Sequence, residues 1–134
     1  MLEVCFLSKM AKQALKGEPI TIIGGSQQME RLDIRDAADG LIAMLKTDPM
    51  NWKPVYNLGS GAVYNIVEIA RKCVEIASRF NKGVKSEIIL EDKPINMRFG
   101  MDSSLFYKDM NWGPRYMLED TIESLIKYYM DYKV

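Results

Sequence analysis

Histidine is absent from the 134 residues of this chain, and this absence excludes more chemistry than any other feature of the composition. Ser-His-Asp triads, cysteine nucleophiles paired with histidine, and metal sites built on imidazole all need a side chain that the sequence lacks. Cysteine is scarce too, because Cys5 and Cys73 are the only two and they do not form a C-x-x-C motif. We expect both to be reduced core thiols, as is usual in a cytoplasmic protein.

Excess charge and long apolar runs are also missing. Lysine plus arginine number 18 and aspartate plus glutamate number 18, so the formal net charge is zero. Nucleic-acid and anionic membrane surfaces attract proteins with a basic excess, and neither is an expected partner. Glu3, Lys9 and Lys12 interrupt the first residues, so neither a signal peptide nor a membrane span is predicted. With 48% hydrophobic residues, the composition predicts one globular domain over 1–134.

Hydrophobic periodicity predicts short strands that alternate with helices, which is the α/β pattern. The predicted strands cover 20–23, 32–34, 55–58 and 86–90. Five helices are predicted. The first covers 2–16 and ends at Gly17, and the second is capped by Asp36 and ends near Lys46. The third covers 66–80, with a capping box from Asn65 and Glu68; the fourth covers 103–108, after Asp102; and the fifth covers 118–129.

Two glycine turns and one tyrosine–lysine pair are candidate cofactor or ligand motifs. Gly59-x-Gly61 lies where a dinucleotide-binding fingerprint would lie, but Tyr64 holds the third glycine position, so turn chemistry is the favoured interpretation. Gly24-Gly25 would let a ligand approach the backbone closely, and plain turn geometry explains it equally well. Tyr129-x-x-x-Lys133 has the spacing of a dehydrogenase catalytic pair, but it lies in the last six residues, and we interpret it as chance.

Arginine is the natural contact for a phosphate, because its planar guanidinium can donate two parallel hydrogen bonds. Arg98 is the best candidate, since it lies in a loop between a predicted strand and a capped helix. Arg35 and Lys108 are interpreted as solvated surface charges.

Five phrases, in order, resemble the C-terminal part of extended short-chain dehydrogenases, the NAD-dependent sugar-nucleotide epimerases and dehydratases. They are 17–24 (GEPITIIG), 34–38 (IRDAA), 55–61 (VYNLGSG), 98–104 (RFGMDSS) and 112–114 (WGP). The resemblance implies the C-terminal portion of a Rossmann-type epimerase or dehydratase: a substrate-binding lobe with the last Rossmann elements, 55–58 among them, but without the N-terminal dinucleotide-binding half.

The resemblance also implies partners and site residues. NAD would bind to the complete enzyme and not to this chain alone, and the expected partners are a nucleotide sugar, the missing Rossmann domain and a second copy of the chain. Arg98 resembles the family arginine that contacts the nucleotide pyrophosphate, and Gly24 the glycine at the strand end beside the nucleotide. A second family arginine falls on Met29, and Arg31, two residues along, is its candidate replacement. Asn111 stands where the family has a glycine, a change expected to affect only the turn.

These features predict the substrate-binding portion of a nucleotide-sugar epimerase or dehydratase, which is not catalytic by itself. A tyrosine base and a cofactor loop would have to come from the missing part. The alternative is a non-catalytic binding or oligomerisation module derived from the same fold.

Overall fold

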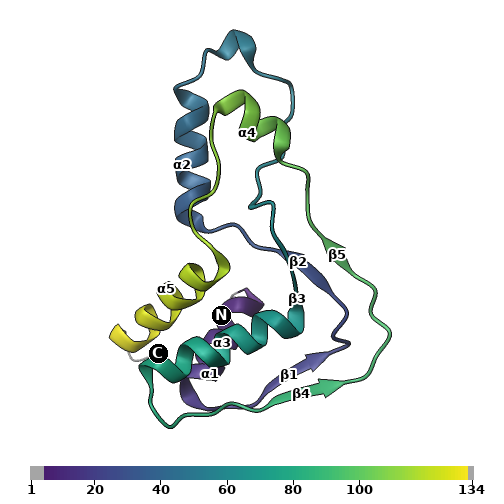
Figure 1. Cartoon of the computed structure of the whole chain (residues 1–134), viewed down its shortest axis with the longest axis vertical. Helices are drawn as coiled ribbons and strands as arrows, with labels where there is room; N and C mark the ends of the chain where they lie inside the picture. The colour runs from purple at the N-terminus through teal and green to yellow at the C-terminus, as the bar shows by residue number, and fades with distance from the viewer. Residues whose placement is uncertain (1–4, 133–134) are drawn as a thin grey trace.

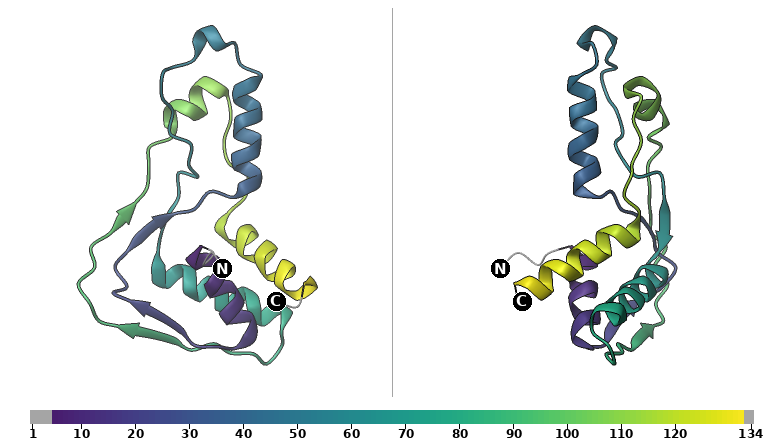
Figure 2. Two further views of the ribbon diagram at one scale, coloured as in Figure 1. Left: turned by 180° about the vertical axis from the view of Figure 1, so that it is seen from behind. Right: turned by 60° about the vertical axis from the view of Figure 1, so that its left-hand side comes forward.

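The computed structural model describes residues 5–132, and its elements gather into a helical body and a narrow arm (Figure 1). The body holds three helices, α1 (Phe6–Lys16), α3 (Ile66–Phe80) and α5 (Leu118–Asp131), together with the strands. The arm holds α2 (Ile34–Leu45), the 3₁₀ turn η1 (Pro49–Asn51) and α4 (Ser104–Met110), and both views of Figure 2 show α4 beside α2. Strands alternate with helices along the chain, so the predicted α/β class is confirmed.

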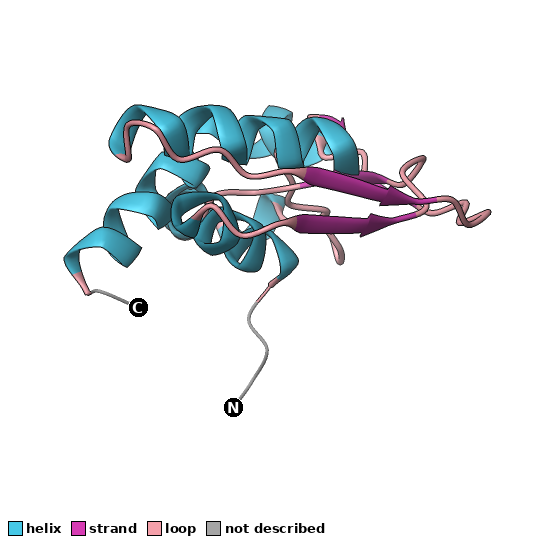
Figure 3. Ribbon diagram, turned by 90° about the horizontal axis from the view of Figure 1, so that it is seen from below, coloured by secondary structure: helices cyan, strands magenta, loops and turns pink. Residues whose placement is uncertain are grey.

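Two small sheets lie beside the helices (Figure 3). In the first, β1 (Ile20–Ile23) pairs in parallel with β4 (Ile88–Glu91). In the second, β2 (Gln28–Glu30) lies between β3 (Val63–Asn65), which is antiparallel to it, and β5 (Arg98–Phe99), which is parallel. The predicted strand over 20–23 is confirmed, and the one predicted over 86–90 is found slightly later in the chain.

The start of α2 corrects two predictions. Residues 32–34 do not form a strand, because Asp33 caps the helix by accepting a hydrogen bond from the backbone N–H of Arg35 at 2.9 Å, so that Ile34 is already helical. Asp36, predicted to be the cap, is instead fully buried in the first turn. Its two carboxylate oxygens accept hydrogen bonds from the backbone N–H groups of Arg115 and Tyr116, at 3.0 and 2.9 Å.

Residues 55–58 are not a strand either, because no strand pairs with them within residues 5–132. Side chains hold this segment in place. The hydroxyl of Tyr56 donates a hydrogen bond to Asp109 at 2.8 Å, and Leu58 packs over Gly40 of α2.

The predicted helix ends are confirmed where a local signal marks them. Gly17 ends α1 with a φ of 72°, the left-handed conformation that glycine adopts without strain. Asn65 and Glu68 form the predicted capping box of α3, and the amide group of Asn65 also donates to the carbonyl of Gly25 at 2.9 Å. The helix predicted to start at residue 2 is seen from Phe6, and Leu2 lies outside the described residues.

The links around α4 also follow the sequence. Asp102 accepts a hydrogen bond from the backbone N–H of Ser104 at 2.9 Å, but Ser103 holds the N-cap position predicted for Asp102, so the helix begins one residue later than predicted. Asn111 takes a left-handed conformation with φ 45° at the other end, which is how an asparagine can stand in for a glycine there.

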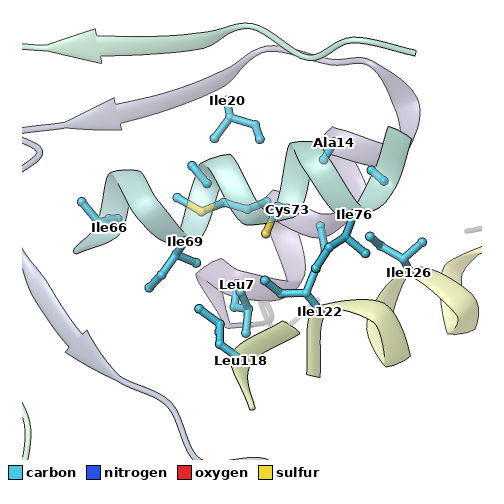
Figure 4. Close-up of a cluster of buried hydrophobic side chains, with 14 of the residues drawn as sticks. Leu7, Ala14, Ile20, Ile66, Ile69, Cys73, Ile76, Leu118, Ile122 and Ile126 are labelled. Atoms are coloured by element: carbon cyan, nitrogen blue, oxygen red, sulfur yellow. The ribbon is translucent and has the colours of Figure 1, made fainter. Parts of the chain in front are cut away.

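The main core lies between α1, α3 and α5 and is covered by β1 (Figure 4). Its central side chains are Ile69, Cys73, Ile76, Ile122 and Ile126, each at most 1% exposed. Burying one large aliphatic side chain contributes about 1.5–3 kcal/mol, so these contacts dominate the stability of the body. Cys73 is buried as predicted, but Cys5 is exposed, which corrects the prediction of a second core thiol; both are free.

A second apolar cluster joins the arm to the C-terminal segment. Phe106 of α4 is 2% exposed and meets Tyr56 and Trp112 edge to face, with ring centroids 5.7 and 5.6 Å away. The indole N–H of Trp112 donates to Asp39 of α2 at 3.0 Å. None of the helices within residues 5–132 is long and apolar enough to cross a membrane.

Candidate functional site

The turn after β1 is built by two glycines and one buried glutamine. Gly24 and Gly25 have φ values of 90° and 114°, so a side chain at either position would be strained. Gln27, only 6% exposed, accepts a hydrogen bond from the N–H of Gly25 and donates one to the carbonyl of Ile23, both at 2.6 Å. Sequence reasoning missed Gln27, because nothing local to it shows that its amide group faces the turn.

The segment that leads to Arg98 lies against this turn. A Cβ added to Gly24 would stand 3.1 Å from the Cβ of Ile95, so glycine is also needed for this close approach. The hydroxyl of Ser26 donates to the carbonyl of Ile95 at 2.7 Å, and the backbone N–H of Gln28 donates to Met97 at 2.9 Å. The structure therefore brings together Gly24 and the segment that carries Arg98, which the sequence separates by more than seventy residues.

Arg98 begins β5 and lies beside β2 (Figure 1). The residue is exposed, and among residues 5–132 no carboxylate lies within ion-pair distance of its guanidinium. It pairs in register with Gln28. Its charge is thus available to an anion that approaches this sheet.

Met29 and Arg31 lie on the other face of β2. Met29 pairs with Phe99 and packs against the core, whereas its neighbour Gln28 pairs with Arg98. Because successive strand residues point to opposite faces, the side chains of Met29 and Arg98 are on opposite sides of the sheet. The Arg31 side chain lies on the same side as Met29, since one of its guanidinium nitrogens is 3.2 Å from the Met29 sulfur. Its guanidinium also stacks over the ring of Phe6 at 4.5 Å. The structure therefore does not bring Arg31 and Arg98 together.

The Gly59-x-Gly61 turn holds a carboxylate of the protein itself. Glu30 accepts hydrogen bonds from the backbone N–H groups of Gly61 at 2.7 Å and Met101 at 2.8 Å. Gly59 lies so close to this carboxylate that a Cβ there would collide with it. A dinucleotide pyrophosphate is anionic and would need the donors that Glu30 occupies, so the turn does not fit NAD. Sequence reasoning missed Glu30, whose partners are all distant in the chain.

The remaining candidates are explained by packing. The Tyr129 hydroxyl is hydrogen-bonded to Ser8 of α1, which places it in the helical body; Lys133 lies outside the described residues. Arg35 is not simply solvated as predicted, because it pairs with Asp33 at 2.8 Å and stacks over Tyr116 at 3.7 Å. Within residues 5–132, no group of three or more cysteine, aspartate or glutamate side chains could hold a metal ion.

Comparison with known proteins finds sequence similarity to one family over part of the chain. Residues 5–59 match the model of the NAD dependent epimerase/dehydratase family. The chain is 27% identical over 127 residues to the low-salt glycan biosynthesis protein Agl12 of Haloferax volcanii, a match that covers 92% of this chain and 39% of that protein.

Solved structures share the fold. The UDP-glucose 4-epimerase of Thermotoga maritima, solved with UDP-glucose, superposes with a TM-score of 0.81 at 17% identity, over 98% of this chain and 41% of the epimerase. The UDP-glucuronic acid 4-epimerase of Bacillus cereus, solved with NAD, gives 0.72 at 22% identity, over 93% and 38%.

The chain spans about two fifths of the length of these relatives. The matched residues include two of the five phrases on which the resemblance was based, and the structural match extends over nearly the whole chain. The chain is thus similar to the NAD dependent epimerase/dehydratase family in sequence over residues 5–59, as its sequence predicts, and it shares the fold of solved epimerases over nearly its whole length.

Proposed function

We propose that this chain is the substrate-binding portion, with the last Rossmann elements, of an NAD-dependent epimerase or dehydratase that acts on a nucleotide-linked sugar. The observation that carries the proposal is the position of Arg98, exposed and beside the segment packed against the Gly24 turn. A guanidinium at such a place can donate two parallel hydrogen bonds to a phosphate. Gly24 would let the nucleotide approach the end of β1 closely.

The proposal gives this chain no catalytic residue and no cofactor of its own. Its one Gly-x-Gly turn ahead of a helix is filled by the carboxylate of Glu30, so NAD would bind in the remaining part of the enzyme. NAD supplies hydride acceptance there, and this chain's residues bind and orient the sugar nucleotide. A reducing cytoplasm is part of the proposal, which the two free thiols support.

A thermal-shift titration tests the proposal. The chain is titrated with UDP-, dTDP- and GDP-sugars and with NAD, in parallel with Arg98→Ala and with the control Arg79→Ala, an exposed arginine on α3. A ligand at 100 times its Kd stabilises the fold by about 2.7 kcal/mol. We expect one nucleotide sugar to raise Tm in the parent and in the control but not in Arg98→Ala, and NAD to have no effect.

The variant Arg31→Ala tests the prediction that Arg31 replaces the family arginine that is absent at Met29. If Arg31 contacts the nucleotide, this variant weakens the same titration; the contacts of Arg31 with Met29 and Phe6, away from Arg98, predict that it does not. A chain that responds to no nucleotide sugar at high concentration would contradict the proposed function.

A second candidate function, assembly without redox chemistry, is favoured by the outer face of α2. Ile34, Leu41 and Leu45 are 80, 56 and 77% exposed on one stripe of this helix. Exposed apolar stripes of this kind mark contacts with other protein surfaces. A second copy of the chain, or the remaining part of a longer enzyme, would pack against this stripe.

The double variant Leu41→Glu/Leu45→Glu separates the two functions. An assembly module would form a stable oligomer in analytical ultracentrifugation that the double variant dissolves, and it would show no nucleotide-sugar response. A substrate-binding portion would keep its Arg98-dependent titration in the same double variant, because α2 lies far along the arm from β5 (Figure 1).

A further inference from the structure

A cavity away from Arg98 lies between the start of α1, the residues that lead from β2 into α2, and α5. Its volume is about 490 Å³, and its walls are mostly carbon, with Leu7, Leu32, Ile34 and Leu125 among them. Pockets that bind small molecules have volumes of roughly 300–1,000 Å³ and walls that are mainly apolar with a few polar groups. The size and the walls therefore suit a small, largely apolar molecule.

Most polar groups that reach the cavity are already paired with one another. Asp33 accepts hydrogen bonds from Arg35 at 2.8 Å and from the hydroxyl of Thr121 at 2.7 Å, and Ser8 is bonded to Tyr129. The negative charge of Asp33 is thus offset by Arg35 inside the same wall. These groups form the frame of the cavity and leave little for a ligand to bind.

Arg31 is the exception. Arg31 is one of the residues that line the cavity, and no carboxylate among residues 5–132 lies within ion-pair distance of its guanidinium. The contacts it does make are weak: a backbone carbonyl at 3.4 Å, the Met29 sulfur at 3.2 Å and the face of the Phe6 ring. Its Nε–H is buried without a hydrogen-bond partner, and a buried donor left unpaired costs free energy. The cavity thus combines apolar walls with one positive charge that the described protein does not neutralise.

We propose that this cavity is a second ligand site, which binds an amphiphilic anion: a molecule with an apolar body and a single carboxylate or phosphate. The anionic head pairs with Arg31, and the body lies against Leu7, Leu32 and Leu125. The site is separate from the proposed nucleotide-sugar site, because the Arg31 guanidinium contacts Met29 and Phe6, and Met29 lies on the opposite side of β2 from Arg98. It is also open, since Ser124 and Tyr128 at its rim are exposed.

The test uses dodecanoate and dodecyl phosphate as probes, each below its micelle concentration, with the neutral dodecyl maltoside at the same concentrations. Isothermal titration calorimetry of the full chain should give saturable binding of one anion per chain. The anionic head gains a charge-assisted hydrogen bond that the neutral head lacks, so the neutral probe should bind at least about ten times more weakly than the anions.

Two variants and two controls make the result specific. Arg31→Gln should reduce the affinity for the anions to that for the neutral probe, and Ser124→Trp, at the exposed rim, should weaken all three without loss of Tm. Arg79→Gln and Arg98→Gln should change nothing. The inference is overturned if no probe binds, if neutral and anionic probes bind alike, or if Arg31→Gln binds as the parent does.

Two further outcomes would also overturn the proposed anion site. Loss of binding in Arg98→Gln would mean that the anions enter the nucleotide-sugar site. Binding to vesicles of phosphatidylglycerol, without binding to monomeric probes, would mean that the chain recognises a lipid surface. Because the nucleotide-sugar titration depends on Arg98 and this one on Arg31, either proposal can fail while the other holds.

Discussion

The buried carboxylate of Asp36 accepts a hydrogen bond from the backbone N–H of Tyr116 at 2.9 Å, and this contact joins the first turn of α2 to the segment that leads into α5. The neighbouring N–H of Arg115 is bonded to the same carboxylate at 3.0 Å. The residues are some eighty positions apart, so one side chain connects the arm to the body of the molecule.

We predict that Asp36→Ala destabilises the chain by about 2–4 kcal/mol, because two buried N–H groups lose their acceptor. Urea unfolding followed by circular dichroism measures the loss. Asp39→Ala is the control on the same helix, since Asp39 is half-exposed and its bonds go to side chains. A smaller loss in Asp36→Ala than in the control would contradict the role given to Asp36.

Asp33 makes the stability depend on pH. Hydrogen bonds from Arg35 and Thr121 lower the pKa of Asp33 from 3.8 to about 2 in the folded chain. Because the folded pKa lies below the unfolded one, this stabilisation is complete above pH 4 and is lost as the pH falls through about 2. The shift corresponds to about 2 kcal/mol.

The pH dependence is measured by urea unfolding at pH 7, 4, 3 and 2 in the parent and in Asp33→Asn. Other acidic groups also titrate in this range, so the difference between the two proteins isolates Asp33. We expect the parent's advantage over Asp33→Asn to shrink between pH 4 and pH 2. An advantage that stays constant over that range would show that the Asp33 carboxylate is not held by its partners.

Gly59 tests the role of Glu30. A Cβ at this position would collide with the Glu30 carboxylate and displace it from the N–H groups of Gly61 and Met101. We predict a loss of about 1–3 kcal/mol for Gly59→Ala. Gly113→Ala is a matched control, because a Cβ there would meet nothing within 4 Å, and we expect it to change stability by less than about 0.5 kcal/mol. Thermal unfolding of both variants compares them directly.

The two thiols should react very differently. Burial raises the pKa of the Cys73 thiol to about 12, whereas Cys5 is exposed. The thiolate is the reactive form, so at pH 8 iodoacetamide should modify Cys5 and leave Cys73 unmodified until the chain is unfolded in urea. Peptide mass spectrometry reads out both sites. Equal rates for the two in the native chain would contradict the burial of Cys73.

The sequence predicts those parts of the fold that short-range signals determine. Gly17 ends α1 because only its own backbone conformation is needed, and Asn65 with Glu68 starts α3 through contacts within one turn. The strand expected over 55–58 fails for the opposite reason: a strand needs a neighbour, and the described chain places none beside this segment.

In the candidate site too, local features could be predicted from the sequence and long-range contacts could not. Arg98 and Gly24 could be singled out from the sequence, because an arginine in a loop and a glycine pair after a strand are local features. Gln27 and Glu30 shape the two glycine turns. Gln27 bonds within its own turn, to Gly25 and Ile23, but no sequence pattern marks such a side-chain contact, and the partners of Glu30 are distant in the chain. Arg31 is separated from Arg98 by its own contacts with Met29 and Phe6 and by the pairing of β2 with β5, which no local pattern reveals.

The hydrogen bond between Ser8 of α1 and Tyr129 of α5 has a consequence for how the chain is made. α1 leaves the ribosome long before α5, against which it packs, and β1 pairs with a strand from the second half of the chain. Contacts between such distant residues slow folding, because a long loop must close before they can form. The core therefore cannot be completed during synthesis until α5 has emerged, and until then α1 and β1 present apolar surface that chaperones recognise.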